Sequence, residues 1–193
     1  MSDWRLKQIQ PVQASPVDLA DVKEHLRVET ADEDSLIQSY VDAAVAYLEG
    51  PYGGGFVLGS QVWEYYTDHF PAQFHLPLYP VQSVDEIRYV DDAGQEQTLA
   101  TTKYRIDTVS NPARIRPGYD VTWPITRALE PNAVAVQFTA GFDPLPADLR
   151  QLVLFMVAHY YEMRSPVISG MVSSSVEFTI ESILSKYRVP GIG

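Results

Sequence analysis

Histidine and carboxylate side chains are the residues of this sequence whose types and spacing could support chemistry. His69 and His75 flank a Phe-Pro turn and could share a metal ion, but the turn has no strong ligand geometry and no third ligand nearby. His159 and Glu162 lie three positions apart on a predicted helix, so they share one face. A di-iron bundle site needs a second such pair, which the sequence lacks. We therefore expect no metal site and no bound cofactor.

Catalysis by a nucleophile or by a carboxylate pair is also weakly supported. The sequence has no Cys and no Gly-x-Ser-x-Gly motif, which excludes a cysteine nucleophile and the usual serine elbow. Glu64 and Asp68 could act as the acid and base of a glycosidase, but any acidic β protein contains such pairs. We expect no catalytic residues and no enzymatic activity. A carboxylate glycosidase is the enzyme alternative.

The charge balance limits the classes of partner that the protein could bind. Its 193 residues include 25 acidic and 14 basic side chains, for a formal net charge of -11. Binding to a phosphate backbone needs clustered Lys and Arg, so general DNA binding is disfavoured. Ten of the acidic residues fall in the first 50 positions, where solubility and helix-end charge matching are the simpler explanation.

Met1 to Gln10 does not resemble a secretory signal, and no apolar run approaches the roughly 18 residues of a membrane span. We expect a soluble protein without membrane contact.

Two helices are predicted before residue 50 and two after residue 145. The first is expected to start at Ser15-Pro16-Val17-Asp18, where a capping hydroxyl precedes proline. The second follows the capping-box pattern of Thr30 to Glu33 and ends at Gly50-Pro51. The third begins after Pro146 and is apolar nearly all round, which indicates burial on several sides. A short fourth helix ends near Tyr187, after a small-residue loop at Ser169 to Ser175 that we expect to be mobile.

The middle of the chain has the composition of β-strands separated by turns. The predicted strands are Ser60 to His69, Val84 to Asp91, Gln95 to Ala100, Tyr104 to Asp107, Ala113 to Arg116 and Ala133 to Ala140. Asp91 to Gly94 forms a tight hairpin, because glycine supplies a positive φ. Short turns without intervening helices predict an antiparallel sandwich or small barrel.

The predicted fold class is therefore α+β, a helical bundle of the N-terminal and C-terminal helix pairs with an inserted antiparallel β region. The helices occupy about 15–49 and 146–188, and the β insertion occupies about 56–141. We expect residues 1–193 to form a single domain. Twelve Tyr, seven Phe and three Trp exceed what a core alone needs. Because contact surfaces are rich in Tyr and Trp, this composition favours an assembly protein over a monomer.

An ordered set of motifs covers about nine tenths of the chain. The motifs are Asp18 to Leu26, Leu76 to Val84 leading into Tyr89 to Asp91, Tyr104 to Asp107, Val136 to Phe142, Leu149 to Arg164 and Leu184 to Val189. No single motif is diagnostic, but their order and spacing together resemble the head-tail connector (adaptor) proteins of tailed bacteriophages and gene transfer agents.

The resemblance implies a structural subunit without catalytic activity. Members of this family form a ring of about twelve copies beneath the portal protein. The ring joins the capsid to the next neck or tail component, such as a stopper, and DNA passes through its lumen without specific binding. The expected location is the neck of a virion or gene transfer agent particle assembled in the bacterial host cytoplasm. The first alternative is that the carboxylate glycosidase is associated with a tail, and the second is another neck protein, such as a stopper or tail-tube subunit.

Two further expectations depend on this resemblance. The C-termini of the family reach toward the portal, which makes Tyr187 and Arg188 candidate partner contacts, although Tyr187 could equally cap the helical core. Lys186 stands where many relatives have proline, so the sequence does not fix the residue at which the last helix ends. A second expectation is that carboxylates of the first 50 residues line the channel or its rim, where they would repel DNA phosphates.

Overall fold

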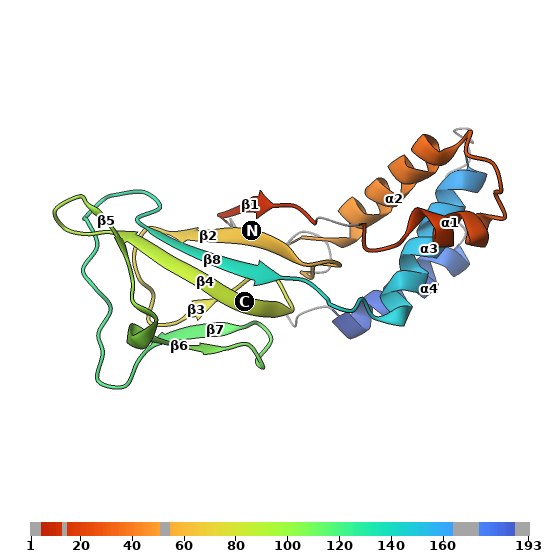
Figure 1. Ribbon diagram of the computed structural model, residues 1–193. Coiled ribbons are helices and arrows are strands. Elements are labelled where there is room, and N and C mark those ends of the chain that lie inside the picture. The colour runs from red at the N-terminus through yellow and green to blue at the C-terminus, as the bar shows by residue number, and fades with distance from the viewer. Residues whose placement is uncertain (1–4, 13–14, 51–54, 164–173, 188–193) are drawn as a thin grey trace. The chain divides into compact units, whose positions relative to one another are not determined.

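The computed structural model describes residues 5–12, 15–50, 55–163 and 174–187 (Figure 1). These residues form four α-helices and antiparallel β-sheets, so the predicted α+β class is confirmed. The chain divides into two compact units. The β unit comprises residues 1–13 and 60–141, and the helical unit comprises residues 14–59 and 142–193. The expectation of a single domain stays a prediction.

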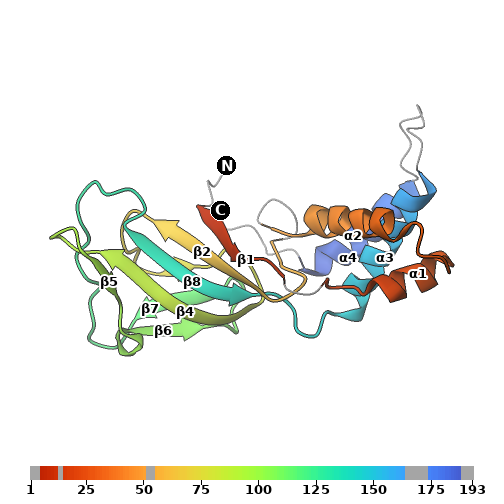
Figure 2. The ribbon, with the colours of Figure 1, turned by 45° about the horizontal axis from the view of Figure 1, so that its top comes forward.

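The β unit contains two antiparallel sheets. The larger sheet has the strand order β1-β2-β8-β4-β5, and the smaller has the order β3-β7-β6. The strand bounds are β1 Leu6–Gln10, β2 Gln61–Thr67, β3 Phe74–His75, β4 Val81–Val90, β5 Glu96–Thr98, β6 Tyr104–Asp107, β7 Arg114–Pro117 and β8 Val134–Ala140, and a 3-10 turn at Thr101–Lys103 precedes β6. Figures 1 and 2 both show the smaller sheet alongside the larger one, as a small sandwich.

The core of the β unit follows from the alternation along β8. Every second residue of this central strand is buried, beginning with Val134, because strand side chains point to opposite faces. Phe138 lies opposite Trp63 of β2 and Val84 of β4 and is fully buried. Ile115 of β7, also fully buried, supplies the inner face of the smaller sheet. One face of each sheet therefore makes the core, and the other carries polar groups.

The predicted strands correspond to β2, β4, β5, β6, β7 and β8, with ends that shift by up to three residues. The predicted hairpin at Asp91 to Gly94 is confirmed. Gly94 has φ 81°, and its N–H donates to the Asp91 carbonyl at 2.9 Å. Two strands were not predicted. β1 belongs to the larger sheet although it lies outside the predicted β insertion, and β3 has only two residues.

The helical unit contains α1 (Leu19–Leu26), α2 (Asp34–Leu48), α3 (Ala147–Glu162) and α4 (Ser174–Tyr187). The predicted stripe of α2 is confirmed at its buried residues, which are Ile37, Val41, Ala44 and Leu48. Helix α3 packs against each of the other three helices, and six of its residues are buried. The prediction that α3 is covered on several sides is therefore confirmed. None of the described helices has the length and apolar character to cross a membrane.

Both predicted N-caps were wrong. Helix α1 begins at Leu19, and the Ser15 hydroxyl donates instead to the Val17 carbonyl at 2.7 Å. Helix α2 begins at Asp34 rather than after Thr30, and its N-cap Glu33 makes no side-chain cap hydrogen bond. Tertiary contacts outcompete the local motif, because the Glu33 carboxylate accepts a hydrogen bond from the Tyr161 hydroxyl of α3 at 2.5 Å.

The predicted mobile loop lies mostly outside the described residues. Residues 164–173 are not described, whereas Ser174 and Ser175 open α4. The fourth helix is therefore longer than the short helix that the sequence predicted, and its end at Tyr187 agrees with the prediction.

Candidate functional site

Glu64 on β2 belongs to a charge network on the outer face of the larger sheet. It is 4% exposed and forms an ion pair with Arg88 of β4. The Tyr66 hydroxyl donates a hydrogen bond to its other carboxylate oxygen. Burial, together with this hydrogen bond, raises the pKa of Tyr66 to about 12. Arg88 also pairs with Glu86 at 2.9 Å and with Glu96 at 3.3 Å.

Asp68, the second carboxylate of the candidate acid-base pair, holds chain segments together. It pairs with Arg5 before β1 and accepts a hydrogen bond from the Asn132 backbone N–H at 2.8 Å. The hydrogen bond from Arg5, followed by that from Asn132, lowers the pKa of Asp68. A glycosidase acid needs a raised pKa. The environment of Asp68 acts in the opposite direction, which disfavours the glycosidase alternative.

The histidines are placed among structural contacts. A ring nitrogen of His75 lies 2.5 Å from the Gln73 side-chain nitrogen, and His75 stands opposite Arg114 in the register of β3 and β7. His159 and Glu162 lie in the last turn of α3, where the His159 ring is tilted against Tyr160. Within the described ranges, no group of three or more His, Asp or Glu side chains could hold a metal ion.

Tyr187, one of the two predicted partner contacts, packs inside the helical unit. Its ring meets Phe56 and Phe142 edge to face, with centroids 6.0 and 5.8 Å away. Its hydroxyl donates to Asp148 of α3 at 2.5 Å. Burial and this hydrogen bond raise the pKa of Tyr187 to about 12, and the same hydrogen bond lowers the pKa of Asp148. These contacts favour the core-capping alternative, and a partner contact stays a prediction. Arg188 lies outside the described residues.

The outer face of β6 and β7 carries an arginine cluster that the sequence analysis missed. The two strands pair so that Asp107 faces Arg114 and Arg105 faces Arg116. Asp107 pairs with Arg114 at 2.6 Å and accepts hydrogen bonds from the backbone N–H groups of Val109 and Ser110, which fixes the turn between the strands. Hydrogen bonds from Ser110 and then from Arg114 hold the pKa of Asp107 far below its usual range.

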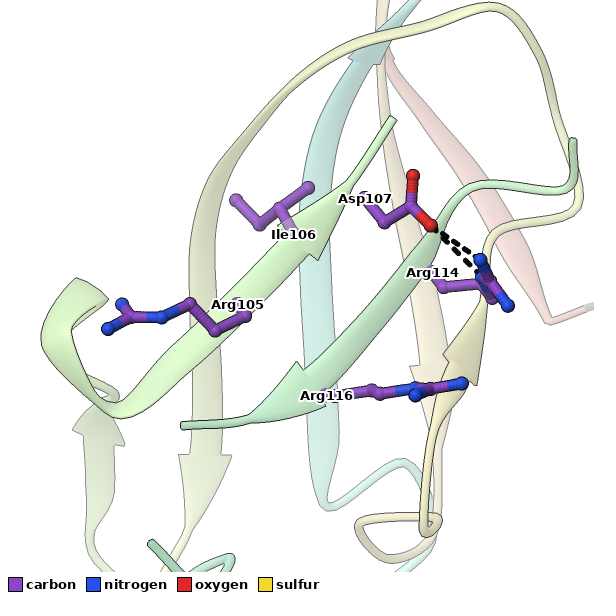
Figure 3. Close-up of a pocket in the computed structure, with 5 residues that line it drawn as sticks. All are labelled: Arg105, Ile106, Asp107, Arg114 and Arg116. Atoms are coloured by element: carbon purple, nitrogen blue, oxygen red, sulfur yellow. Dashed lines mark hydrogen bonds and ion pairs between the residues drawn. The ribbon is translucent and has the colours of Figure 1, made fainter. Parts of the chain in front are cut away.

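The second pair of this register has like charges. Arg105 and Arg116 are exposed and directly opposite, an arrangement that is unfavourable on a sheet surface. Figure 3 shows their guanidinium groups extending in opposite directions, whereas Asp107 and Arg114 point toward each other. Arg116 contacts the Gln73 side-chain oxygen. Arg105 has no hydrogen bond or ion pair with the part of the chain that the structure describes.

We call this surface the basic face, defined by Arg105, Arg114 and Arg116. Together with Ile106 and Asp107 these residues line a pocket of about 120 Å³ (Figure 3). A sequence signal existed, because four of the 14 basic residues of the chain lie between positions 103 and 116. This local group of basic residues was missed because the net charge of the whole chain is negative. Of the three arginines, Arg105 and Arg116 have no carboxylate partner among the described residues, and their planar guanidinium groups are suited to bind carboxylates or other planar anions.

The sequence matches one known family. Residues 16–110, about half of the chain, match the family described as phage gp6-like head-tail connector protein. This segment contains α1, α2 and the strands from β2 to β6. No curated protein sequence is significantly similar to the chain.

Solved structures resemble the chain over almost its full length. A chain in the virion of a native gene transfer agent particle has 26% identity and a TM-score of 0.77, with 98% of this chain and 97% of that chain covered. A chain in the neck of an empty gene transfer agent particle, computed with C6 symmetry, has 28% identity and a TM-score of 0.76. A chain in the neck of the native particle, computed with C12 symmetry, has 26% identity and a TM-score of 0.72. The last two matches each cover 97% of both chains.

Proposed function

The chain belongs to the family of phage gp6-like head-tail connector proteins, and from this premise we propose that it forms a ring of about twelve copies beneath the portal protein of a phage or gene transfer agent particle. The ring would join the capsid to the next neck component, such as a stopper, and leave its lumen open to DNA. Its location would be the neck of the particle.

One observation carries this proposal. Both units of the chain are matched in neck structures, because 97% of this chain and 97% of each neck chain are covered. A match confined to one unit would indicate only a shared building block. The C12 symmetry used for the neck of the native particle supports a twelve-fold ring, and the C6 symmetry used for the neck of the empty particle is compatible with it, because twelve is a multiple of six.

We also propose that the protein acts by geometry and has no catalytic activity. The family and the matched structures are components of particles. The candidate carboxylates Glu64 and Asp68 are each held by an arginine. Both pairings support a structural role, and for Asp68 the hydrogen bond from Arg5 lowers the pKa, which favours the ionised form that a proton donor must avoid.

The distribution of charge supports a lumen that does not retain DNA. The helical unit contains most of the first 50 residues, which carry a net charge of -6. Those carboxylates that a neighbouring copy does not cover would repel phosphates at the channel or its rim and leave the duplex free to move. A lumen dominated by Arg and Lys in an assembled ring would overturn this part of the proposal.

The test is electron microscopy of the purified chain mixed with the portal protein of the same particle. We expect closed rings stacked on one face of the portal. A control sample of the chain alone, at the same low concentration, should contain no rings. A chain that stays monomeric and binds neither the portal nor any other particle component would overturn the proposal. A ring that binds only below another connector would identify the chain as a stopper.

A further inference from the structure

The basic face is an unbalanced surface on an acidic protein. Asp107 neutralises Arg114, but no carboxylate of the described residues approaches Arg105 or Arg116. Both arginines are exposed, and β6 is the edge strand of its sheet. Like charges at opposite positions of the register are unfavourable on a sheet surface, and an anionic partner that binds these guanidinium groups would offset that cost.

A matching acidic surface lies on the helical unit. Residues 18–34 carry seven carboxylates and two basic side chains. Asp21, Glu33 and Asp34 have partners within the helical unit. The exposed members without a partner among the described residues are Asp18, Glu24, Glu29 and Asp32. We call residues 18–34 the acidic segment.

We propose that the basic face of one copy docks onto the acidic segment of the neighbouring copy in the ring. This inference rests on the proposed ring. A closed ring uses a head-to-tail contact, so each subunit must present two different surfaces that complement each other. Carboxylates of the neighbour would bind the guanidinium groups of Arg105 and Arg116, and the exposed Val109 at the β6–β7 turn adds an apolar contact.

DNA is the competing ligand for an arginine cluster, and the composition of the pocket disfavours it. The Asp107 carboxylate and the Ile106 side chain line the pocket beside the arginines. The Asp107 carboxylate repels a phosphate oxygen. A protein partner can instead place a hydrogen-bond donor or a basic side chain beside this carboxylate. The net charge of -11 repels DNA along the whole duplex. It also repels a second copy, so docking between copies depends on the local pairing of opposite charges.

The test uses charge reversal in the portal-binding assay. The variant R105E/R116E reverses the basic face, and K7E/R127E is the matched control with the same change in net charge. We expect R105E/R116E to raise the chain concentration for half-occupancy of the portal more than tenfold and the control to raise it less than twofold. Folding of each variant is checked by circular dichroism and by its unfolding midpoint.

Compensation makes the test specific. The variant E29K/D32K reverses the acidic segment and should also fail to close rings. A chain that carries all four substitutions should close rings again, because each interface regains opposite charges. Normal assembly of R105E/R116E, or no recovery in the fourfold variant, would overturn the inference while leaving the proposed function intact. Absence of rings from the unmodified chain would instead overturn the proposed function.

A DNA-binding measurement covers the competing ligand. Fluorescence anisotropy with a short duplex should give no binding by the unmodified chain at physiological salt. Duplex binding that R105E/R116E abolishes, with normal ring closure, would reassign the basic face to DNA.

Discussion

The two sheets of the β unit each expose an arginine-bearing face, and the faces differ in how their charges are balanced. On the larger sheet, Arg88 is surrounded by three carboxylates, one of them the buried Glu64. On the smaller sheet, Arg105 and Arg116 occupy opposite positions of the register, and neither has a carboxylate partner among the described residues. An arginine satisfied within its own chain contributes to stability. An arginine without a carboxylate partner is available to a second molecule, so its removal should change assembly rather than stability.

The largest expected effect on stability is on the face of the larger sheet, where Arg88 pairs with three carboxylates. Replacement of Arg88 by alanine leaves the Glu64 carboxylate buried without its counter-charge, which should lower the free energy of unfolding by about 3 kcal/mol. Urea denaturation of the purified chain measures it. The matched control is R116A on the other sheet, which should stay within about 0.5 kcal/mol of the unmodified chain. Equal losses in the two variants would show that the contrast between the faces is wrong.

Tyr187 extends the comparison to the helical unit. Its hydroxyl is satisfied by Asp148, so the variant Y187F should lose about 1 kcal/mol of stability through one missing hydrogen bond. Because the ring contacts with Phe56 and Phe142 remain, portal occupancy should be unchanged. Urea denaturation and the portal assay are compared on the same preparation. Normal stability with impaired portal binding would favour the partner contact that the sequence resemblance implied.

The pH dependence of Asp107 tests the one satisfied pair of the basic face. The pKa of Asp107 is lowered in the folded state, so its contribution to stability is complete above the unfolded value of 3.8 and is lost as the pH falls. The stability difference between the unmodified chain and D107N should therefore be largest near about pH 7 and shrink below about pH 4. Denaturation at several pH values measures it. A difference that stays constant down to about pH 3 would contradict the assigned ion pair.

The sequence predicted those elements whose signals are local. The hairpin at Asp91 to Gly94 required only a glycine with positive φ, and the buried stripe of α2 required only helical spacing. Strand β1 was missed because Leu6–Gln10 has no strong strand composition and becomes a strand by pairing with β2, about 55 residues away. The cap predicted at Thr30 failed for a similar reason, since Tyr161 of α3 binds Glu33.

The site was harder to predict than the fold because it depends on register. Both strands of the basic face were predicted with nearly correct ends, and the cluster of basic residues was visible. A shift of two residues in the register would bring Arg105 opposite Arg114 instead of Arg116, and a shift of one residue would bring it opposite Ile115 or Pro117. The register depends on hydrogen bonds from Val109 and Ser110 to Asp107, which composition does not reveal.

The smallest expected effect concerns the like-charge pair itself. If Arg105 and Arg116 repel each other in the free subunit, the variant R105S should be neutral or more stable by about 0.3 kcal/mol. A double-mutant cycle with R116S isolates the pair, and its coupling energy should be unfavourable and should fade as salt rises, because exposed charges are screened. The cycle is measured by urea denaturation at low and high salt. A favourable coupling would mean that the two arginines stabilise the free subunit, and the basic face would then need no anion from a neighbour.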